Sequence, residues 1–539
     1  MTPPHSLALG DVLPLARRLQ ATPDPLALYA ELSDGGERPH CLLLESADAA
    51  TGIGERSLLA ASCALHLVAE AGEVTVRALS PNGEAGVAWL AARHRRDPQS
   101  GGRAVTIPFP QATLGIAEES ERFRRPSPLD LLRDAAHAVR LASRPNPWCH
   151  LLLGALAYDL IDLFEELPPG RPDLLEQPLY EFWVPDALVV LDHVRGQANV
   201  VATVWGGPGT PERYHDAART VEALVERVRR APARREPSAP AAASPSEAEG
   251  NGAGAVEVDL DDAAFAAVVA QLQHHLQAGD AYQIVPSRTF SLPCPAPLAS
   301  YQRLRRTNPS PYMFYLRSDH RTLFGASPER CVGVDGPSHK VQIRPIAGTA
   351  PRGRDGAGRL DPDADARNEA ALRLDAKEMA EHLMLVDLAR NDVARVSRPG
   401  TRKVARLLTV ERYSHVMHLV SEVEGTLQPG GDALGAYAAT MNMGTLVGAP
   451  KVRAAQILRE VEASRRGFYG GAVGYLTHDG TLETCIVIRS ALVAGGVAQV
   501  RAGAGVVLDS DPVSEARETS RKAQALLEAI AGAGTPAYA

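Results

Sequence analysis

The chain has little lysine, no long apolar run and no basic block, and each shortage excludes a class of protein. Only five of its 56 basic residues are lysine, and the formal net charge is −8, which argues against a surface that follows a nucleic-acid backbone. The most apolar stretch, residues 149–164, is interrupted by His150, Asp159 and Asp162. It is also shorter than the ~20 residues of a membrane-spanning helix, so no membrane span is predicted.

Cysteine motifs and targeting signals are missing as well. The six cysteines are scattered without a CxxC pair, which indicates neither a disulfide framework nor a zinc site. The N-terminal residues MTPPHSLALGDV lack the basic start and the small-residue cleavage site of a signal peptide. These absences predict a protein of the reducing cytoplasm.

The length of 539 residues predicts roughly two to four domains. Residues 231–257 contain no aromatic residue and are rich in Ala, Pro, Ser, Glu and Gly, which is typical of a flexible linker. Before it, residues 1–230 mix strand-like runs with amphipathic helical patterns. After it, residues 258–532 open with a helical pattern and then turn mostly to strands and turns. We therefore expect an α+β protein with two domains joined by a linker.

Three alternating runs between residues 469 and 508 predict an antiparallel meander. Gly495-Gly496 separates the last two runs and is a strong signal for a two-residue turn. That turn would set Arg489 opposite Ala502 and beside residues 503–505, where a guanidinium and glycine-exposed N–H groups suit a carboxylate. A buried arginine with a structural partner is an equally good interpretation.

The other turn signal of the meander, His478-Asp479-Gly480, raises a difficulty. A two-residue turn across Asp479 would place Tyr469 opposite Ser490, on the face away from Arg489. If Tyr469 and Arg489 line one pocket, this turn must be longer or carry a bulge.

Two predicted helices each carry an E-x-x-E pair on a row that leads into apolar residues. Such rows turn inward, and buried carboxylates need a cation or several hydrogen-bond donors. Because the carboxylates are few, Mg²⁺ completed by water or substrate oxygens fits better than a Ca²⁺ cage. The alternative is chance, since such pairs are common on solvated helix faces. The pairs are Glu378 with Glu381, in residues 375–396, and Glu515 with Glu518, which precedes Lys522 in a helix capped by Asp511.

Nine motifs in one order resemble the chorismate-utilising enzymes, most of all the large subunits that form anthranilate. The motifs are PYMFYL (311–316), FGASPE (324–329), PIAGT (345–349), EHLMLVDLARND (381–392), HVMHLV (415–420), GTLVGAPKVRA (444–454), YGGAVGY (469–475), CIVIRSA (485–491) and AGAGVVLDSDPVSEARET (502–519). The resemblance implies antiparallel sheets packed face to face with helices outside. It also implies that residues 1–230 form a regulatory region partly intertwined with a chorismate-binding catalytic domain.

The resemblance implies a reaction in which chorismate and ammonia give anthranilate and pyruvate with Mg²⁺, the first committed step of L-tryptophan biosynthesis. Glu381 and Glu518 match the Mg²⁺ ligands. His418 matches a histidine near the reacting ring, where it would transfer a proton. Further catalytic positions are Gln283, Thr445 and Lys522. The residues that match chorismate contacts are Gly348, Thr349, Tyr469, Arg489, Gly503, Ala504 and Gly505.

Two positions separate the chain from related enzymes of the family. Isochorismate-forming members carry a water-activating lysine where this chain has Gln283. Aminodeoxychorismate synthases read PIKGT, with a nucleophilic lysine where this chain has Ala347. The alanine leaves room for ammonia itself, which favours anthranilate. An aminodeoxychorismate or aminodeoxyisochorismate synthase, or a catalytically silent tryptophan-binding paralogue, stays open as an alternative.

The resemblance also implies an effector and a protein partner. Residues 41–62 are similar to the segment that holds L-tryptophan in feedback-inhibited members, with an ordinary strand and acidic loop as the alternative. The chain lacks the GxCxG motif of a glutaminase. Ammonia would therefore come from a separate glutamine amidotransferase subunit, in a heterotetramer of two large and two small subunits. The expected effector contacts are Glu45, Ser46, Arg56, Pro311, Tyr312 and Met313.

Overall fold

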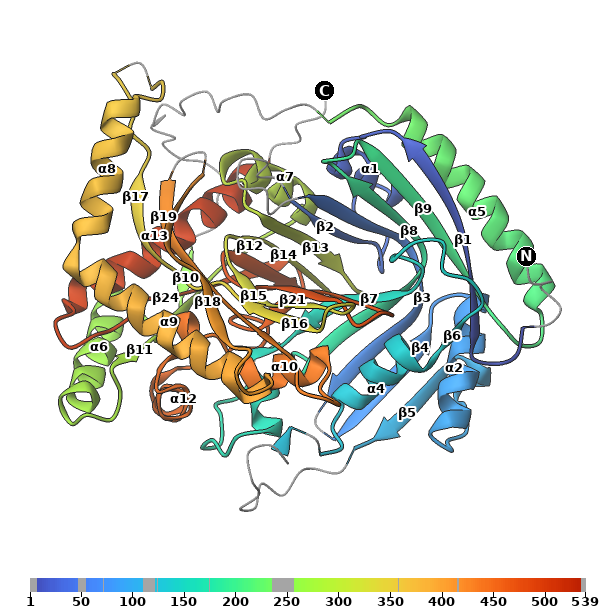
Figure 1. The fold of residues 1–539 in the computed structure, drawn as a ribbon, viewed down its shortest axis with the longest axis horizontal. Coiled ribbons are helices and arrows are strands. Elements are labelled where there is room, and N and C mark those ends of the chain that lie inside the picture. The colour runs from blue at the N-terminus through green and yellow to red at the C-terminus, as the bar shows by residue number, and fades with distance from the viewer. Residues whose placement is uncertain are drawn as a thin grey trace.

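A computed structural model describes the chain except for residues 1–6, 47–54, 71, 110–121, 124, 174, 235–255, 357, 414–415 and 535–539. Most of the expected linker, 231–257, thus lies outside the described residues. Helices surround large antiparallel sheets, which confirms the α+β class (Figure 1). In the part of the chain that the structure describes, no helix is both long and apolar enough to cross a membrane.

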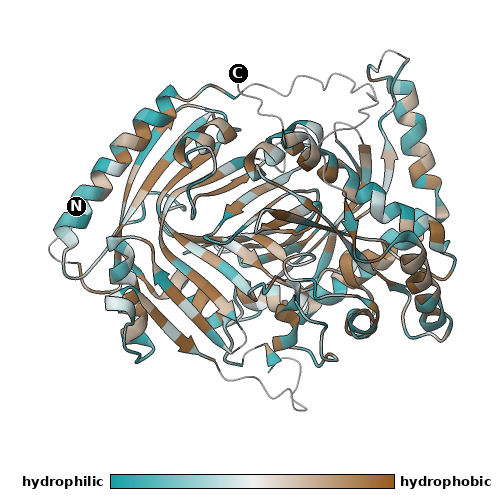
Figure 2. Cartoon of the chain, turned by 180° about the vertical axis from the view of Figure 1, so that it is seen from behind, coloured by the Kyte–Doolittle hydropathy of each residue, from teal (hydrophilic) through white to brown (hydrophobic). Residues whose placement is uncertain are grey.

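The N-terminal region is a sheet built on two long strands, β3 (Arg56–Glu70) and β8 (Tyr180–Asp192). They pair antiparallel, with register shifts between Ala60 and Leu65. Hydrophobic and hydrophilic residues form bands across the strands of the sheets, as the colours of Figure 2 show. The strands that extend the sheet are β4 (Glu73–Ala78) and β5 (Ala104–Pro108) beside β3, and β9 (Gln197–Trp205), β1 (Asp11–Gln20) and β6 (Arg140–Leu141) beside β8. The helices that pack on it are α1 (Pro25–Leu32), α2 (Pro81–Arg93) and α5 (Thr210–Arg230).

Strands of the C-terminal half continue this sheet at two places and form two further sheets. The first sheet starts from β2 (Leu42–Glu45) and runs through β13 (Tyr312–Arg317), β14 (Arg321–Ser327), β23 (Ser490–Ala494), β24 (Val497–Gly503), β12 (Ser287–Pro293) and β10 (Glu257–Val258). The second sheet starts from β7 (Leu151–Leu156) and runs through β21 (Ala472–Thr477), β22 (Leu482–Ile486), β15 (Arg330–Asp335), β16 (Lys340–Ile343), β19 (Val416–Thr426), β17 (Ile346–Pro351) and β18 (Lys403–Arg412). Side chains of both sheets share one apolar core, which confirms the expected intertwined, face-to-face arrangement.

Two helices of the C-terminal half carry the paired carboxylates and cover different sheets. Helix α13 (Pro512–Ala531) packs on β24 and β12, whereas α9 (Ala376–Val396) packs on β19 and β17. Asp511 caps α13 by accepting from the N–H of Ser514, as predicted, and Asp375 caps α9. The neighbouring helices are α6 (Asp262–Gln277) and α7 (Pro297–Thr307) beside α13, and α8 (Pro362–Leu374), α10 (Ala433–Thr440), α11 (Gly444–Val447) and α12 (Lys451–Val461) on the side of α9.

The meander agrees with the sequence at one turn and differs at Arg489. Ala494 pairs with Val497, so the two-residue turn at Gly495-Gly496 is confirmed. The expected pairing of Arg489 with Ala502 is wrong, because β22 ends at Ile486 and β23 begins only after Arg489. Arg489 has a φ of 49° at the point where the chain crosses from the second sheet to the first. A single alternating run of residues here supplies two strands in different sheets.

The turn at His478-Asp479-Gly480 has more than two residues. Leu476 pairs with Leu482, and the N–H of Thr477 donates to the carbonyl of Thr481 at 2.9 Å. The two-residue turn considered from the sequence is therefore wrong, and the longer turn holds. The shift of one position removes the objection to Tyr469 and Arg489 sharing a pocket.

Candidate active site

The carboxylates of α9 and α13 lie close to each other, where the two helices approach at the left of Figure 1. Burial raises the pKa of Glu378, and the negative charges of Glu381 and Glu518 raise it further. Burial likewise raises the pKa of Glu515, with Glu518 adding to the effect. Four carboxylates from two helices therefore repel one another across this junction.

The donor set at this junction fits a hard divalent cation. Glu381 and Glu518 are half-buried carboxylates from different helices, and Glu515 Oε2 is buried without a hydrogen-bond partner among the described residues. Mg²⁺ takes a few carboxylates and completes its shell with water or substrate oxygens. Among the described residues, no three His, Cys, Asp or Glu side chains are placed to enclose a metal by themselves. The geometry therefore suits a cation that shares its shell with a bound ligand.

Gln283 connects the α9 carboxylates to the glycine run 503–505. It lies in β11 (Gln283–Ile284), which pairs with β20 (Gly448–Ala449). Its Nε2 donates to Glu381 Oε1 at 3.1 Å, whereas its Oε1 is buried without a partner. A Cβ at Gly505 would come within 2.8 Å of Gln283 Nε2. A larger residue at position 505 would therefore displace the Gln283 amide.

Arg489, Thr445 and Lys522 surround a carboxyl group that the sequence interpretation missed. Thr445 Oγ1 donates to Glu329 Oε1 at 3.2 Å. Burial raises the pKa of Glu329 to about 8, although Thr445, Lys522 and Arg489 all act to lower it. The available signal was its position: it ends the motif FGASPE, directly after a buried apolar strand, where a carboxylate requires a reason.

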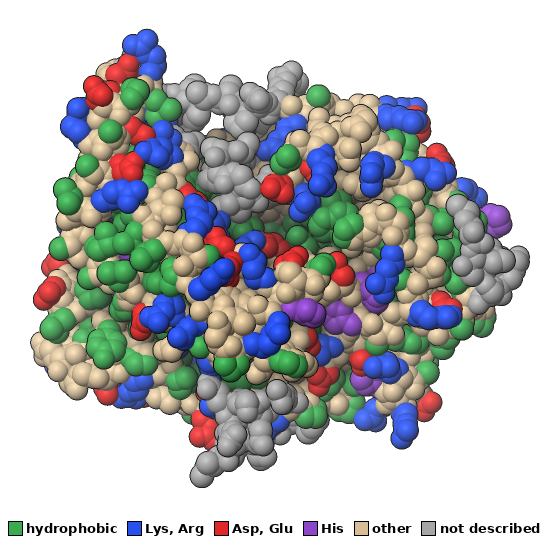
Figure 3. All heavy atoms as spheres, viewed as in Figure 1, with side chains coloured by type: hydrophobic (Ala, Val, Ile, Leu, Met, Phe, Trp, Pro, Cys, Tyr) green, Lys and Arg blue, Asp and Glu red, His purple; other side chains and the backbone are tan. Residues whose placement is uncertain are grey.

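Arg489 is exposed to solvent, although many protein atoms lie around its guanidinium group. The loss of solvation caused by these atoms lowers the pKa of Arg489, and the charge of Glu329 opposes that effect. Figure 3 shows a hollow near the middle of the molecular face, bordered by acidic and basic side chains. An arginine held in this way keeps a charge available for an anionic ligand.

His418 and Thr349 face each other across the β17–β19 ladder. Thr349 Oγ1 lies 2.8 Å from His418 Nδ1. Burial, followed by the charge of Arg489, lowers the pKa of His418 to about 4, so the imidazole is neutral at pH 7. Next to Thr349, Gly348 has a φ of 86°, a conformation that favours glycine. His418 is therefore an uncharged imidazole, with one ring nitrogen that carries a hydrogen and one that can accept a proton.

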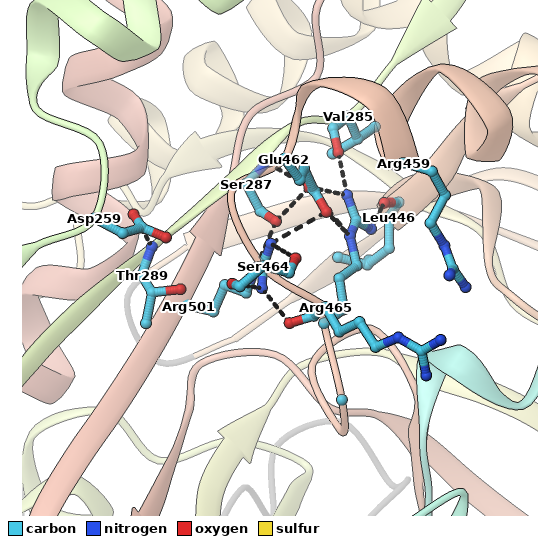
Figure 4. Close-up of polar contacts among 12 residues, drawn as sticks. Asp259, Val285, Ser287, Thr289, Leu446, Arg459, Glu462, Ser464, Arg465 and Arg501 are labelled. Atoms are coloured by element: carbon cyan, nitrogen blue, oxygen red, sulfur yellow. Dashed lines mark hydrogen bonds and ion pairs between the residues drawn. The ribbon is translucent and has the colours of Figure 1, made fainter. Parts of the chain in front are cut away.

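Tyr469 lies beside the glycine run 503–505, which Lys522 also contacts. Its hydroxyl lies 3.1 Å from the position of a Cβ on Gly503, and the carbonyl of Gly503 accepts from Lys522 Nζ at 3.0 Å. Behind Tyr469, the Glu462 carboxylate accepts from Arg501, Ser287 and a further arginine (Figure 4). This buried network fixes the strand and loop that carry Tyr469.

The expected effector residues fall into two groups. In the first, Glu45 is buried, accepts from Tyr301 Oη at 2.6 Å and pairs with Arg305 Nε at 3.0 Å. Glu45 Oε2 and the buried hydroxyl of Ser46 have no hydrogen-bond partner among the described residues. Met313 is the strand partner of Glu45, so these residues meet across the boundary between the two halves of the chain.

The second group consists of Tyr312, Arg56 and Pro311. Tyr312 Oη donates to Glu483 Oε1 at 2.9 Å. Arg56 lies over the ring of Trp148, 5.6 Å from its centroid, and 3.8 Å from Asp192. Pro311 is buried at the entrance to β13. Between Ser46 and Arg56, residues 47–54 lie outside the described chain.

Comparisons with known proteins agree with this geometry. The family model described as chorismate binding enzyme matches residues 93–528. The chain is 48% identical over 521 residues to anthranilate synthase component 1 of Vibrio cholerae, covering 96% of each chain. It is 45% identical to the protein of that name from Escherichia coli, covering 95% of each.

Two solved structures resemble this chain. Anthranilate synthase component I from Streptococcus pneumoniae has a TM-score of 0.67 and 28% identity, covering 88% of this chain and 92% of that one. MenF, the menaquinone-specific isochorismate synthase from Escherichia coli, has a TM-score of 0.63 at 17% identity, covering 96% and 94%, which shows a common fold.

Proposed function

The chain belongs to the chorismate binding enzyme family, and from this premise we propose that it is the large subunit of an anthranilate synthase. It converts chorismate and ammonia into anthranilate and pyruvate, the first committed step of L-tryptophan biosynthesis. One observation carries the proposal: Thr445, Lys522 and Arg489 all act on the buried carboxyl group of Glu329, in a chain similar to anthranilate synthases along nearly its full length. In this proposal residues 1–230 regulate and residues 258–532 catalyse.

Substrate binding follows from the charges of the candidate active site. Glu381 and Glu518 would hold Mg²⁺, which, when bound, would polarise the ring carboxylate of chorismate as a Lewis acid. Arg489 would pair with the enolpyruvyl carboxylate, where a charge-assisted hydrogen bond is strong. The Tyr469 hydroxyl and the backbone of residues 503–505 would orient the same group. These contacts fix the ring between α9 and α13.

Two groups of opposite protonation state would move the protons. Because its pKa is about 8, Glu329 holds a proton at pH 7 and can donate it to the departing C4 hydroxyl. His418, whose pKa is about 4, is free to accept the ring proton that is lost as the ring becomes aromatic. The pKa values of an acid and a base are thus separated by their surroundings.

Ammonia is the nucleophile that these surroundings favour. The partnerless Oε1 of Gln283 would accept a hydrogen bond from ammonia, and an amide cannot act as the base that activates water. Ala347 offers no amine for covalent attack on the ring, and its small side chain leaves space there. Both features disfavour the isochorismate-forming and aminodeoxychorismate-forming alternatives.

Regulation and ammonia supply complete the proposal. L-Tryptophan would bind at Glu45 and Ser46, whose unused buried oxygens suit its ammonium group. Because effector and substrate bind at different places, inhibition would act through the relative stability of two arrangements of the chain. A separate cytoplasmic glutamine amidotransferase would deliver ammonia within a tetramer of two large and two small subunits.

The test is a product assay on the purified chain with chorismate, an ammonium salt and Mg²⁺. We expect fluorescent anthranilate and an equal amount of pyruvate. A product that retains the enolpyruvyl group, detected by mass, would instead identify an enzyme that stops at the aminated intermediate. The absence of any product, with tryptophan still bound, would identify a silent binding protein.

A further inference from the structure

Strand β17 bulges at the residues that face the proposed reaction. Its pairing with β19 shifts between Ile346 and Thr349, so Ala347 and Gly348 together face Leu419. A bulge leaves backbone groups without a ladder partner, and their positions must be set in another way. Ala347 and Gly348, where Ala347 is the proposed determinant of the nucleophile, are therefore the part of β17 that pairing with β19 fixes least.

Strand β18, on the other side of β19, bulges at nearly the same level. Its pairing shifts between Arg406 and Thr409, so Leu407 and Leu408 together face Ser421. Leu408 has a φ of 54°, an unfavourable conformation for a leucine. Such a conformation persists only where the surroundings enforce it.

One buried pair of side chains connects the two bulges. His382 Nδ1 lies 3.1 Å from the carbonyl oxygen of Ala347, and His382 Nε2 lies 2.7 Å from Ser421 Oγ. The N–H of Leu408 donates to Ser421 Oγ at 3.0 Å. Both side chains are fully buried. All their polar atoms therefore have partners.

The direction of these hydrogen bonds follows from chemistry. A carbonyl oxygen only accepts, so His382 Nδ1 carries the hydrogen. In a neutral imidazole, Nε2 then accepts from the Ser421 hydroxyl, whose oxygen accepts from Leu408. The chain of bonds runs from the β18 backbone through Ser421 and His382 to the β17 backbone.

We propose that His382 and Ser421 are positioning residues for the proposed reaction, which this inference takes as its basis. His382 follows the carboxylate Glu381 in α9, and it holds the carbonyl of the residue two positions before Thr349. It therefore sets the distance between the cation-binding helix and the strand that grips chorismate. An error of about 1 Å in such a distance can cost about 100-fold in rate.

The experiment compares Ser421→Ala, His382→Ala and the double variant with Val423→Ala. Val423 is fully buried in the same strand and lies outside the hydrogen-bonded chain, so it controls for lost stability. We expect kcat/KM for chorismate to fall about 100-fold for His382→Ala and about tenfold for Ser421→Ala. Because the two residues act as one unit, the double variant should be no worse than His382→Ala.

A conservative variant separates positioning from packing. His382→Asn keeps an amide donor near the Ala347 carbonyl but cannot reach Ser421, so it should recover at least part of the loss in His382→Ala. Val423→Ala should lower the melting temperature and leave kcat/KM within about twofold. An equal loss of kcat/KM in Val423→Ala, or multiplicative losses in the double variant, would overturn the proposal.

A second measurement does not depend on turnover. Amide hydrogen exchange of residues 344–351 should be faster in Ser421→Ala than in the unsubstituted protein, and unchanged in Val423→Ala. If the unsubstituted protein made no anthranilate, the proposed function would fail while this exchange result still tested the positioning. Unchanged exchange in Ser421→Ala would overturn the positioning role whatever the product.

Discussion

The candidate active site and the proposed effector region both contain carboxyl groups whose pKa is raised by burial, but these groups have different partners. At the active site, Glu329 remains protonated near neutral pH despite two cations nearby, and the carboxylates of α9 and α13 repel one another. In the effector region, Glu45 is more deeply enclosed but is paired with Arg305 and Tyr301 inside the chain. At the first site, unbalanced charge is left for a ligand to neutralise. At the second site, partners within the chain already neutralise most of the charge.

This difference predicts different costs for the same kind of substitution. Removing a charge from a repelling cluster relieves the folded state and is harmful only to function. Removing one partner of a buried pair leaves the other charge unpaired, which destabilises the fold. Activity and stability should therefore respond in opposite ways at the two sites.

The largest effect is expected for Glu381→Gln. Loss of this proposed cation ligand should lower kcat at least about 1,000-fold, since Lewis-acid stabilisation contributes several kcal/mol. The free energy of unfolding should rise by about 0.2–0.5 kcal/mol, because Glu378 loses a like charge one turn away. Anthranilate fluorescence and urea unfolding measure the two quantities. Asp387→Asn, on the exposed face of the same helix, is the control and should leave kcat unchanged. A destabilised Glu381→Gln protein would contradict the comparison.

Glu329→Gln tests the proton donor and should lower kcat about 100-fold at pH 7. In the unsubstituted enzyme, kcat should decline as pH rises above about 8, because the donor loses its proton. Glu329 also makes the free energy of unfolding depend on pH. Because its pKa in the folded protein is raised above the ordinary value, its contribution to stability is fully present below about pH 4.5 and is lost between about pH 4.5 and pH 8. Glu329→Gln should flatten this decline in unfolding free energy. An unchanged pH dependence of unfolding would show that Glu329 is ionised in the folded protein.

Two arginine substitutions compare the sites directly. Arg489→Met should raise KM for chorismate about 10- to 100-fold, the value of a lost charge-assisted hydrogen bond, with little change in unfolding free energy. Arg305→Met should instead cost about 3 kcal/mol of stability, because it leaves Glu45 buried without its cation. Chorismate kinetics and chemical unfolding of both variants give the comparison. Equal stability losses would show that the two arginines have the same structural role.

The sequence predicted most of the local structure and part of the site. Helical rows and caps located Glu381 and Glu518, and the glycine pair located the β23–β24 turn. The break at Arg489 was not predictable, because the change of sheet depends on strands far away in the chain. Local alternation shows that a segment is extended but not which neighbours it pairs with.

Protonation states were equally out of reach of the sequence. The pKa of Glu329 depends on burial by several separate segments, and its partner Thr445 lies 116 positions away. From the sequence, His418 is expected to titrate like an ordinary histidine. Its lowered pKa comes from burial and from the charge of Arg489 in the folded chain. Motifs therefore identify which residues meet, whereas the energetic state of each residue depends on the folded surroundings.

The smallest effect is expected for Ser46→Ala in the effector region. Its hydroxyl is buried without a described partner, so a bound tryptophan would gain one hydrogen bond there. Losing it should weaken inhibition about tenfold, equivalent to about 1.4 kcal/mol. The measurement is the concentration of L-tryptophan that halves the rate of each variant, relative to that variant's own uninhibited rate. Ser300→Ala is the control, since that hydroxyl donates to the carbonyl of Ala296, the N-cap residue of helix α7. Unchanged inhibition would remove Ser46 from the effector contacts, and the effector region would then have to be sought around Arg56 and Trp148, whose contacts form the second group.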